Sequence, residues 1–103
     1  MKSTEVTMVR VYLTEETAHL RQLLARLHDQ EQVRGVTVFR GISGFGKSGK
    51  LHSSNLLDMS LNLPVVVEFF DRPDKVRSIL EHLGAFIEPG HIVSWPAHVN
   101  DQD

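Results

Sequence analysis

The centre of the chain reads Gly41-Ile42-Ser43-Gly44-Phe45-Gly46-Lys47-Ser48-Gly49-Lys50-Leu51-His52. This stretch holds four of the seven glycines and two of the four lysines in the protein. Glycine lets backbone N–H groups turn toward a ligand without a side chain in the way. Lysine adds a mobile positive charge that suits phosphate. The composition therefore predicts a loop that can hold a phosphate.

Two folds compete for this stretch, because residues 41–48 also read G-x-x-x-x-G-K-S, the phosphate-binding loop of nucleotide triphosphatases. That motif requires a buried strand before the loop and a helix that starts at the Lys-Ser pair. Residues 36–39 fit the strand, but Gly49 and the polar run 53–55 favour a turn over a helix. A doubly wound sheet also needs long helical crossovers, and the chain has room for about four strands. We therefore keep a P-loop enzyme that hydrolyses nucleotide triphosphates only as the last of three alternatives; the other two are given below.

Apolar residues on both sides of the stretch follow the periods of strands and helices. Alternation or short apolar runs predict strands at residues 7–13, 36–40, 64–70 and 92–95. Spacings of i, i+3, i+4 and i+7 predict two amphipathic helices, with apolar stripes Leu20, Leu23, Leu24, Leu27 and Val76, Ile79, Leu80, Leu83. We expect Asp71 to cap the second helix and Pro96 to stop the last strand. Residues 1–5 and 100–103 are expected to be frayed ends.

The order of these elements is β-α-β-β-α-β, two similar halves in succession. Right-handed crossovers place the third strand between the first two. The expected fold is α+β and ferredoxin-like, a four-stranded antiparallel sheet with both helices on one face. The other face of the sheet is left bare, and an exposed apolar face usually marks an interface. Self-association is the simplest way to cover it.

Size and composition exclude several classes of protein. The 103 residues make one domain, 1–103, and the absence of cysteine excludes disulfides, zinc–thiolate sites and thiol catalysis. The net charge of −2 gives no sign of the basic surface that nucleic-acid binding requires. The first residues lack the apolar core of a signal peptide, and no apolar run reaches membrane-spanning length. We expect a cytoplasmic protein that does not insert into a membrane. It is also expected not to be an enzyme, because no catalytic set is visible.

Several short motifs from residue 44 onward resemble the motifs of a known protein family. Gly44-Phe45-Gly46-Lys47, followed by Gly49 and His52 and by a strand that opens at Pro64, resembles the nitrogen-signalling PII proteins, whose second strand ends in a similar motif before the T-loop. Residues 88–92, Glu-Pro-Gly-His-Ile, resemble their B-loop. From Val9 to Val99 the chain looks like the PII-like family DUF190. The matching pieces are residues 44–46 with His52, residues 63–71 and residues 90–92.

The resemblance implies a homotrimeric signalling protein whose sheets line the interior of the trimer. It implies that AMP, ADP or ATP binds between subunits, and that the loop 46–62 then acts on a membrane transporter or a metabolic enzyme. The candidate nucleotide-binding residues are Gly44, Phe45, Gly46, Lys47, Gly49, Lys50, Gly90 and His91. PII proteins hold phosphate with further arginines near the C-terminus, and this chain has none after Arg77. The number of phosphates is therefore left open.

The second alternative, from another class, is a trimeric metal-binding or structural module based on histidine. The six histidines lack the spacing of a metal site, but symmetry-related copies could meet in a trimer. The weak candidates for metal ligands are His52 and His91.

Overall fold

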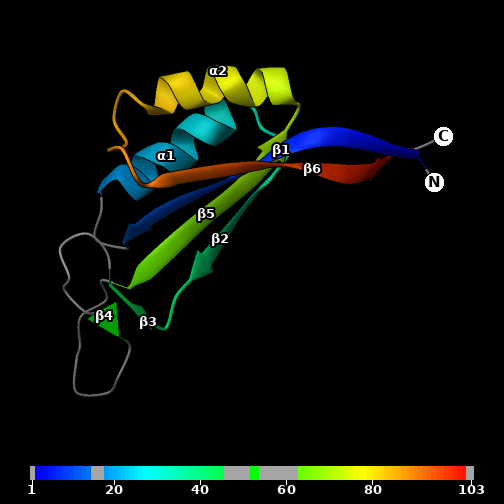
Figure 1. Ribbon diagram of the computed structural model, residues 1–103. Coiled ribbons are helices and arrows are strands. Elements are labelled where there is room, and N and C mark those ends of the chain that lie inside the picture. Colours follow the sequence, from blue (N-terminus) through cyan, green and yellow to red (C-terminus); the bar gives the residue numbers. More distant parts are fainter. Residues whose placement is uncertain (1, 15–17, 46–51, 54–62, 102–103) are drawn as a thin grey trace.

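The computed structural model describes residues 2–14, 18–45, 52–53 and 63–101 (Figure 1). Its elements in chain order are β1 (Lys2–Thr14), α1 (Ala18–Asp29), β2 (Val36–Arg40), β3 (Ser43–Gly44), β4 (His52–Ser53), β5 (Pro64–Asp71), α2 (Pro73–Leu83) and β6 (Ile92–Asp101). The predicted loop 46–62 therefore lies mostly outside the described residues. Within the described part, no helix has the length and apolar character needed to cross a membrane.

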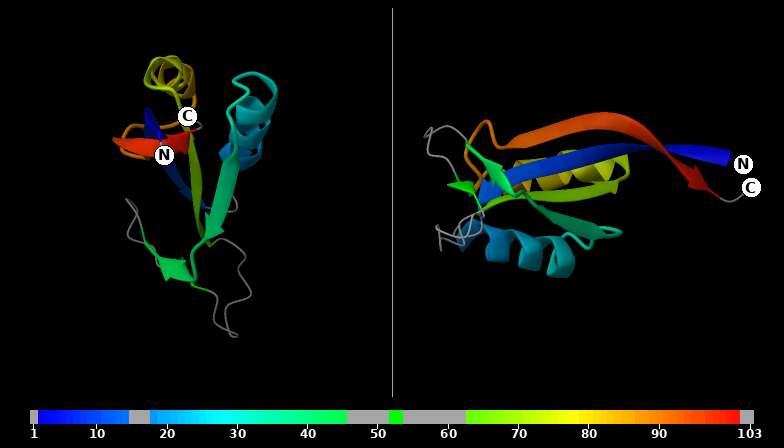
Figure 2. Two further views of the ribbon diagram at one scale, coloured as in Figure 1. Left: turned by 90° about the vertical axis from the view of Figure 1, so that its right-hand side faces the viewer. Right: turned by 90° about the horizontal axis from the view of Figure 1, so that it is seen from below.

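Four strands form one antiparallel sheet in the order β2-β5-β1-β6. Strand β5 thus lies between β1 and β2, as the crossover rule predicted. Both helices pack on the same face of this sheet (Figure 2). The predicted ferredoxin-like fold is confirmed. The doubly wound parallel sheet of the P-loop alternative is excluded, because every pair in the main sheet is antiparallel.

The core lies between the helices and the covered face of the sheet. The strands contribute alternate residues: Val9 and Val11 from β1, and Val65, Val67 and Phe69 from β5. The helices contribute one apolar stripe each, with Leu23, Leu27, Val76, Ile79 and Leu83 buried. Burial of each large aliphatic or aromatic side chain is worth roughly 1.5–3 kcal/mol. The predicted helical periods therefore identify the residues that hold the fold together.

The open face of the sheet is aromatic, with one charged pair in its middle. Tyr12, Phe39, Val93 and Trp95 are 37–47% exposed there. The Nε of Arg10 donates to Oε1 of Glu68 at 2.8 Å, directly across from it in the neighbouring strand. The Arg10 guanidinium lies 5.9 Å from the Phe39 ring centroid and 5.7 Å from that of Trp95. The hydrogen bond to Glu68 raises the pKa of Arg10 above its ordinary value.

The ends of the chain differ from the expected frayed segments. Strand β1 begins at Lys2, and its first residues pair with the end of β6, from Lys2 with Asp101 to Glu5 with His98. The Thr4 hydroxyl donates to Oδ2 of Asp101 at 2.7 Å. The paired ends of β1 and β6 extend beyond the helices (Figure 1), so they cover little apolar surface. Residues 2–5 therefore alternate too weakly in polarity for the sequence to predict a strand.

Two local predictions also differ. Strand β6 continues through Pro96 to Asp101, because β6 is an edge strand, where a missing N–H is tolerated. The cap of α2 lies one residue later than expected, at Arg72, and makes no side-chain cap hydrogen bond. Asp71 instead ends β5, and its Oδ1 accepts a hydrogen bond from the Arg72 N–H at 2.9 Å.

Candidate functional site

One end of the sheet gathers the two motifs that the sequence analysis selected. Strand β2 ends at Arg40, which pairs with Val65 at the start of β5. At the same end, the Tyr12 N–H donates to the carbonyl oxygen of His91 at 2.8 Å, just before β6. The stretch 41–45 and the turn 90–91 therefore share one end of the molecule, opposite the two termini (Figure 1).

The two motifs nevertheless lie at opposite edges of that end. The order β2-β5-β1-β6 puts two strands between the stretch that follows β2 and the turn that precedes β6. Neighbouring strands are about 4.8 Å apart, so the two motifs are separated by about 14 Å within one chain. Each motif lies at an open edge, where a second copy of the chain could reach it.

The stretch after β2 is packed tightly onto Pro64. The Gly41 N–H donates to the Pro64 carbonyl oxygen at 2.7 Å, which continues the pairing of β2 with β5. A Cβ at Gly44 would lie 3.1 Å from Pro64 Cγ, and one at Gly41 would lie 3.3 Å from Pro64 Cβ. Gly44 also pairs with His52 in the short ribbon β3–β4, which the sequence did not predict. The next residue, Phe45, is 74% exposed.

The turn before β6 uses glycine for a different reason. Gly90 has a φ of +92°, the left-handed region that side chains rarely adopt, and no atom lies within 4 Å of a Cβ built there. The Nδ1 of His91 is 2.8 Å from the Tyr12 carbonyl oxygen. Because a carbonyl oxygen only accepts, Nδ1 carries the proton. The other ring nitrogen, Nε2, is 4.0 Å from Oε2 of Glu88 and is the atom that His91 can offer to a ligand.

Several predicted site residues lie outside the described part of the chain: Gly46, Lys47, Gly49 and Lys50. Of the weak metal candidates, His52 is described by its backbone pairing, and the Nδ1 of His91 is already used by Tyr12. Among the described residues, no three His, Cys, Asp or Glu side chains gather closely enough to hold a metal ion.

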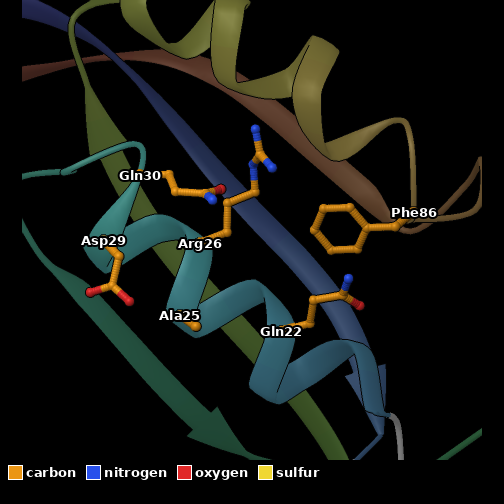
Figure 3. Close-up of a pocket in the computed structure, with 6 residues that line it drawn as sticks. All are labelled: Gln22, Ala25, Arg26, Asp29, Gln30 and Phe86. Carbon is orange, nitrogen blue, oxygen red and sulfur yellow. The ribbon is translucent and has the colours of Figure 1, made fainter.

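The structure also has a small groove between α1 and the segment after α2 (Figure 3). Its volume is about 290 Å³, and it is lined by Gln22, Ala25, Arg26, Asp29, Gln30 and Phe86. The Arg26 guanidinium at this groove is already paired, because its Nε donates to Oε2 of Glu31 at 2.9 Å. The same carboxylate oxygen lies 2.9 Å from Nδ1 of His82. None of the lining residues belongs to the predicted nucleotide site.

Pro64 and Tyr12 contact the predicted site residues at this end, although the sequence analysis did not assign either of them to the site. The sequence analysis gave Pro64 only as the start of a strand, and Tyr12 only as part of the strand at residues 7–13. Each acts through a contact between segments far apart in sequence, Pro64 with Gly44 and Tyr12 with His91. No local pattern signals such contacts; only the strand order could have suggested them.

The sheet order and the two helices place the chain in the ferredoxin-like class. The model of the DUF190 family (Uncharacterized ACR) matches residues 6–99, and the chain belongs to this family. The predicted resemblance is thereby confirmed. A UPF0166 protein of Aquifex aeolicus is 30% identical over 88 residues, which cover 81% of this chain and 83% of that protein. A UPF0166 protein of Methanocaldococcus jannaschii is 28% identical over 97 residues, which cover 89% of each.

Solved structures share the fold at lower identity. CPII from Thiomonas intermedia K12, bound to ADP and bicarbonate, matches with a TM-score of 0.64 and 19% identity, over 95% of this chain and 89% of that one. A protein of Thermus thermophilus described as PII-like matches with a TM-score of 0.63 and 15% identity, over 96% of this chain and 91% of that one. These likenesses establish a PII-like fold.

Proposed function

We propose that this chain is a regulatory PII-like protein that forms a homotrimer and binds an adenine nucleotide between its subunits. The observation that carries the proposal is the position of the two motifs at the same end of the sheet but at opposite edges. Within one chain two strands separate the motifs, whereas the edges of two neighbouring chains can place them side by side.

The nature of the ligand is supported by the solved neighbours. CPII structures have been determined with ADP and bicarbonate, and with ADP, AMP and bicarbonate. In this chain the exposed Phe45 ring offers an apolar wall for a base. On the facing edge, the Nε2 of His91 can donate to a phosphate when the ring is protonated. Lys47 and Lys50 supply the remaining positive charge, with Gly46 and Gly49 beside them in the sequence.

Assembly is supported by the open face of the sheet. The exposed aromatic side chains of this face, Tyr12, Phe39 and Trp95, and its one ion pair resemble the composition of interface cores. In the proposed protein, the nucleotide changes the loop 46–62, and a partner protein, a membrane transporter or a metabolic enzyme, reads the change. A ligand achieves this only if it binds one loop conformation better than the other. We place no catalytic step on this site.

The test is calorimetric titration with AMP, ADP and ATP, with Lys47→Ala and His91→Ala as site variants. We expect each variant to weaken the binding of the preferred nucleotide at least tenfold, about 1.4 kcal/mol. Gly35→Ala is a matched control, because no atom of the described residues lies within 4 Å of a Cβ at that position. Unaltered binding by Lys47→Ala would remove the phosphate loop from the site.

Mixed oligomers test the sharing of the site between chains. Lys47→Ala and His91→Ala chains are co-expressed with different tags, and the mixed trimers are purified. A shared site leaves one intact site in each mixed trimer, formed by Lys47 of one chain and His91 of its neighbour. A site built within one chain gives mixed trimers that bind no better than the parent variants. Recovery of binding therefore supports the proposal, and its absence contradicts it.

A further inference from the structure

At two positions in the stretch after β2, Gly41 and Gly44, the side chain of Pro64 favours glycine, and the backbone conformation does not. Among the described glycines, only Gly90 has a left-handed φ, so Gly41 and Gly44 have conformations that alanine can adopt. The obstacle to a side chain at these positions is the limited space beside Pro64. At Gly44 the nearest atom to a Cβ is Pro64 Cγ at 3.1 Å, and the next is Pro64 Cβ at 3.8 Å. At Gly41 the nearest are Pro64 Cβ at 3.3 Å, with Cγ and the carbonyl oxygen at 3.4 Å.

We propose that Gly41 and Gly44 are positioning residues that seat the ribbon β3–β4 on the ring of Pro64, and that they make no contact of their own with the ligand. This inference rests on the proposed function, and it revises one part of it, because the sequence had assigned Gly44 to nucleotide binding. This packing of the ribbon β3–β4 on Pro64 determines the position of Phe45, the residue that follows β3. The nucleotide site depends on that placement.

A side chain at position 44 would displace the ribbon β3–β4, because Pro64 is held in place by the main sheet. Pro64 begins β5, pairs with Thr14 of β1 and accepts the Gly41 N–H at 2.7 Å, so it is fixed from two sides. The strands of the ribbon are two residues long and have only each other as pairing partners in the described sheets. A methyl group at position 44 would therefore lift β3 from the proline ring and carry Gly44, its partner His52 and the adjacent Phe45 with it.

A double-mutant cycle with Pro64→Ala separates this role from ligand contact. Pro64→Ala removes Cγ and keeps Cβ. Among the residues that the structure describes, the nearest remaining side-chain atom to an alanine at position 44 then lies at 3.8 Å, an ordinary contact distance. At position 41 the same change leaves Cβ at 3.3 Å and the carbonyl oxygen at 3.4 Å. Pro64→Ala should therefore rescue Gly44→Ala and fail to rescue Gly41→Ala, which makes position 41 a matched control.

The measurements are the melting temperature and the dissociation constant of the nucleotide bound best by the unaltered protein. We expect Gly44→Ala alone to lower the melting temperature by about 5 °C. We expect it to weaken nucleotide binding about tenfold. In the Pro64→Ala background the same substitution should change the melting temperature by less than about 1 °C and affinity by less than about twofold.

The outcomes decide between the roles. If Gly44→Ala costs as much affinity in the Pro64→Ala background as in the unaltered protein, Gly44 contacts the ligand and the positioning role is wrong. If Pro64→Ala fails to restore the melting temperature of Gly44→Ala, or restores Gly41→Ala just as well, the contact of position 44 with Cγ is not the cause and the packing on the ring is wrong. If the protein binds no nucleotide at all, the proposed function fails, and the melting temperatures still test the packing on the ring by themselves.

Discussion

The two faces of the sheet are built by alternate residues of the same strands, and they serve different purposes. On β5, Val65, Val67 and Phe69 are buried against the helices, while Val66, Glu68 and Phe70 point to the open face and are partly exposed. The covered face is almost entirely aliphatic; the open face is aromatic and carries the Arg10–Glu68 pair. The comparison teaches that the residues that stabilise the single chain and those of the proposed contact between chains alternate along the same strands. A register slip of one residue would exchange them.

The neighbouring phenylalanines Phe69 and Phe70 give the largest test of this division. Phe69 is 1% exposed in the core, so Phe69→Ala should lower the free energy of unfolding by about 3–5 kcal/mol. Phe70 lies on the other face, 5.6 Å from the Arg34 guanidinium, and Phe70→Ala should cost about 1 kcal/mol. Urea denaturation of each variant measures both values. Equal losses would mean that the faces do not divide as described.

Trp95 tests the open face as a surface for self-association. Trp95→Ala should weaken the association of subunits by about 2 kcal/mol, roughly thirtyfold, because aromatic residues at the centre of an interface carry much of its energy. Light scattering during size-exclusion chromatography measures the effect. Arg77→Ala, an exposed position on the helical side, is the control. If the Trp95→Ala variant forms a trimer that resists dilution as well as the unaltered protein does, the interface does not lie on this face.

Asp71 is the charged group of the covered face. It is 3% exposed, and its Oδ2 is 3.0 Å from Nζ of Lys75. Burial by itself would raise the pKa of the Asp71 carboxyl, but hydrogen bonds from the Arg72 N–H and the Lys75 ammonium, and the charge of Lys75, bring it below the ordinary value of 3.8. A lowered pKa in the folded state contributes stability that is complete above the ordinary value and is lost as the pH falls through the folded-state value.

We therefore expect the free energy of unfolding to fall as the pH is lowered below about 3.8. Asp71→Asn should reduce stability at neutral pH by about 1.5 kcal/mol and flatten this part of the pH dependence. Urea denaturation between about pH 7 and about pH 2, before and after the substitution, measures both effects. An identical acid dependence in the two proteins would assign the loss to other carboxyls.

Substitution of Glu68 should have the smallest effect on stability. Its effect on the melting temperature of the single chain should differ from its effect on the association of subunits. The Arg10 side chain is 40% exposed, so water already screens the pair, and Glu68→Gln should shift the melting temperature of the single chain by less than about 2 °C. In an assembly that covers this face, Arg10 would lose both water and its partner, and the same change should weaken association more. Comparing unfolding at low protein concentration with the dissociation constant of the oligomer separates the two. Equal effects would argue that the pair stays in water.

The sequence predicts most of the fold because the covered face has a regular pattern. The leucine spacing of α1 and the valines of β5 follow periods that only a helix and a buried strand satisfy. Lys2–Glu5 were missed because a ribbon beyond the helices has no apolar face to alternate. The ribbon β3–β4 was missed because strands of two residues are too short to show a period.

The candidate site was predictable only in part. The glycine of the turn at Gly90 and His91 is explained by its left-handed φ, whereas its predicted role in nucleotide binding stays a prediction. The reason for Gly44 is a contact with Pro64, about twenty residues away, which no local pattern records. The separation of the motifs at opposite edges follows from the strand order, which the sequence does predict. The residues 46–51, which carry both lysines of the stretch, lie outside the described part.

The pairing of the two chain ends has a practical consequence for any experiment on this protein. Lys2 and Asp101 are direct neighbours in the sheet, at the far end of a molecule that measures 53 Å along its longest axis. A fluorescent reporter or an affinity handle fused to either terminus would lie at the opposite end of the molecule from the proposed nucleotide site (Figure 1). Because the paired ends of β1 and β6 are so close, a short peptide could join them, and a circularised chain would test whether these strands must separate in the proposed assembly.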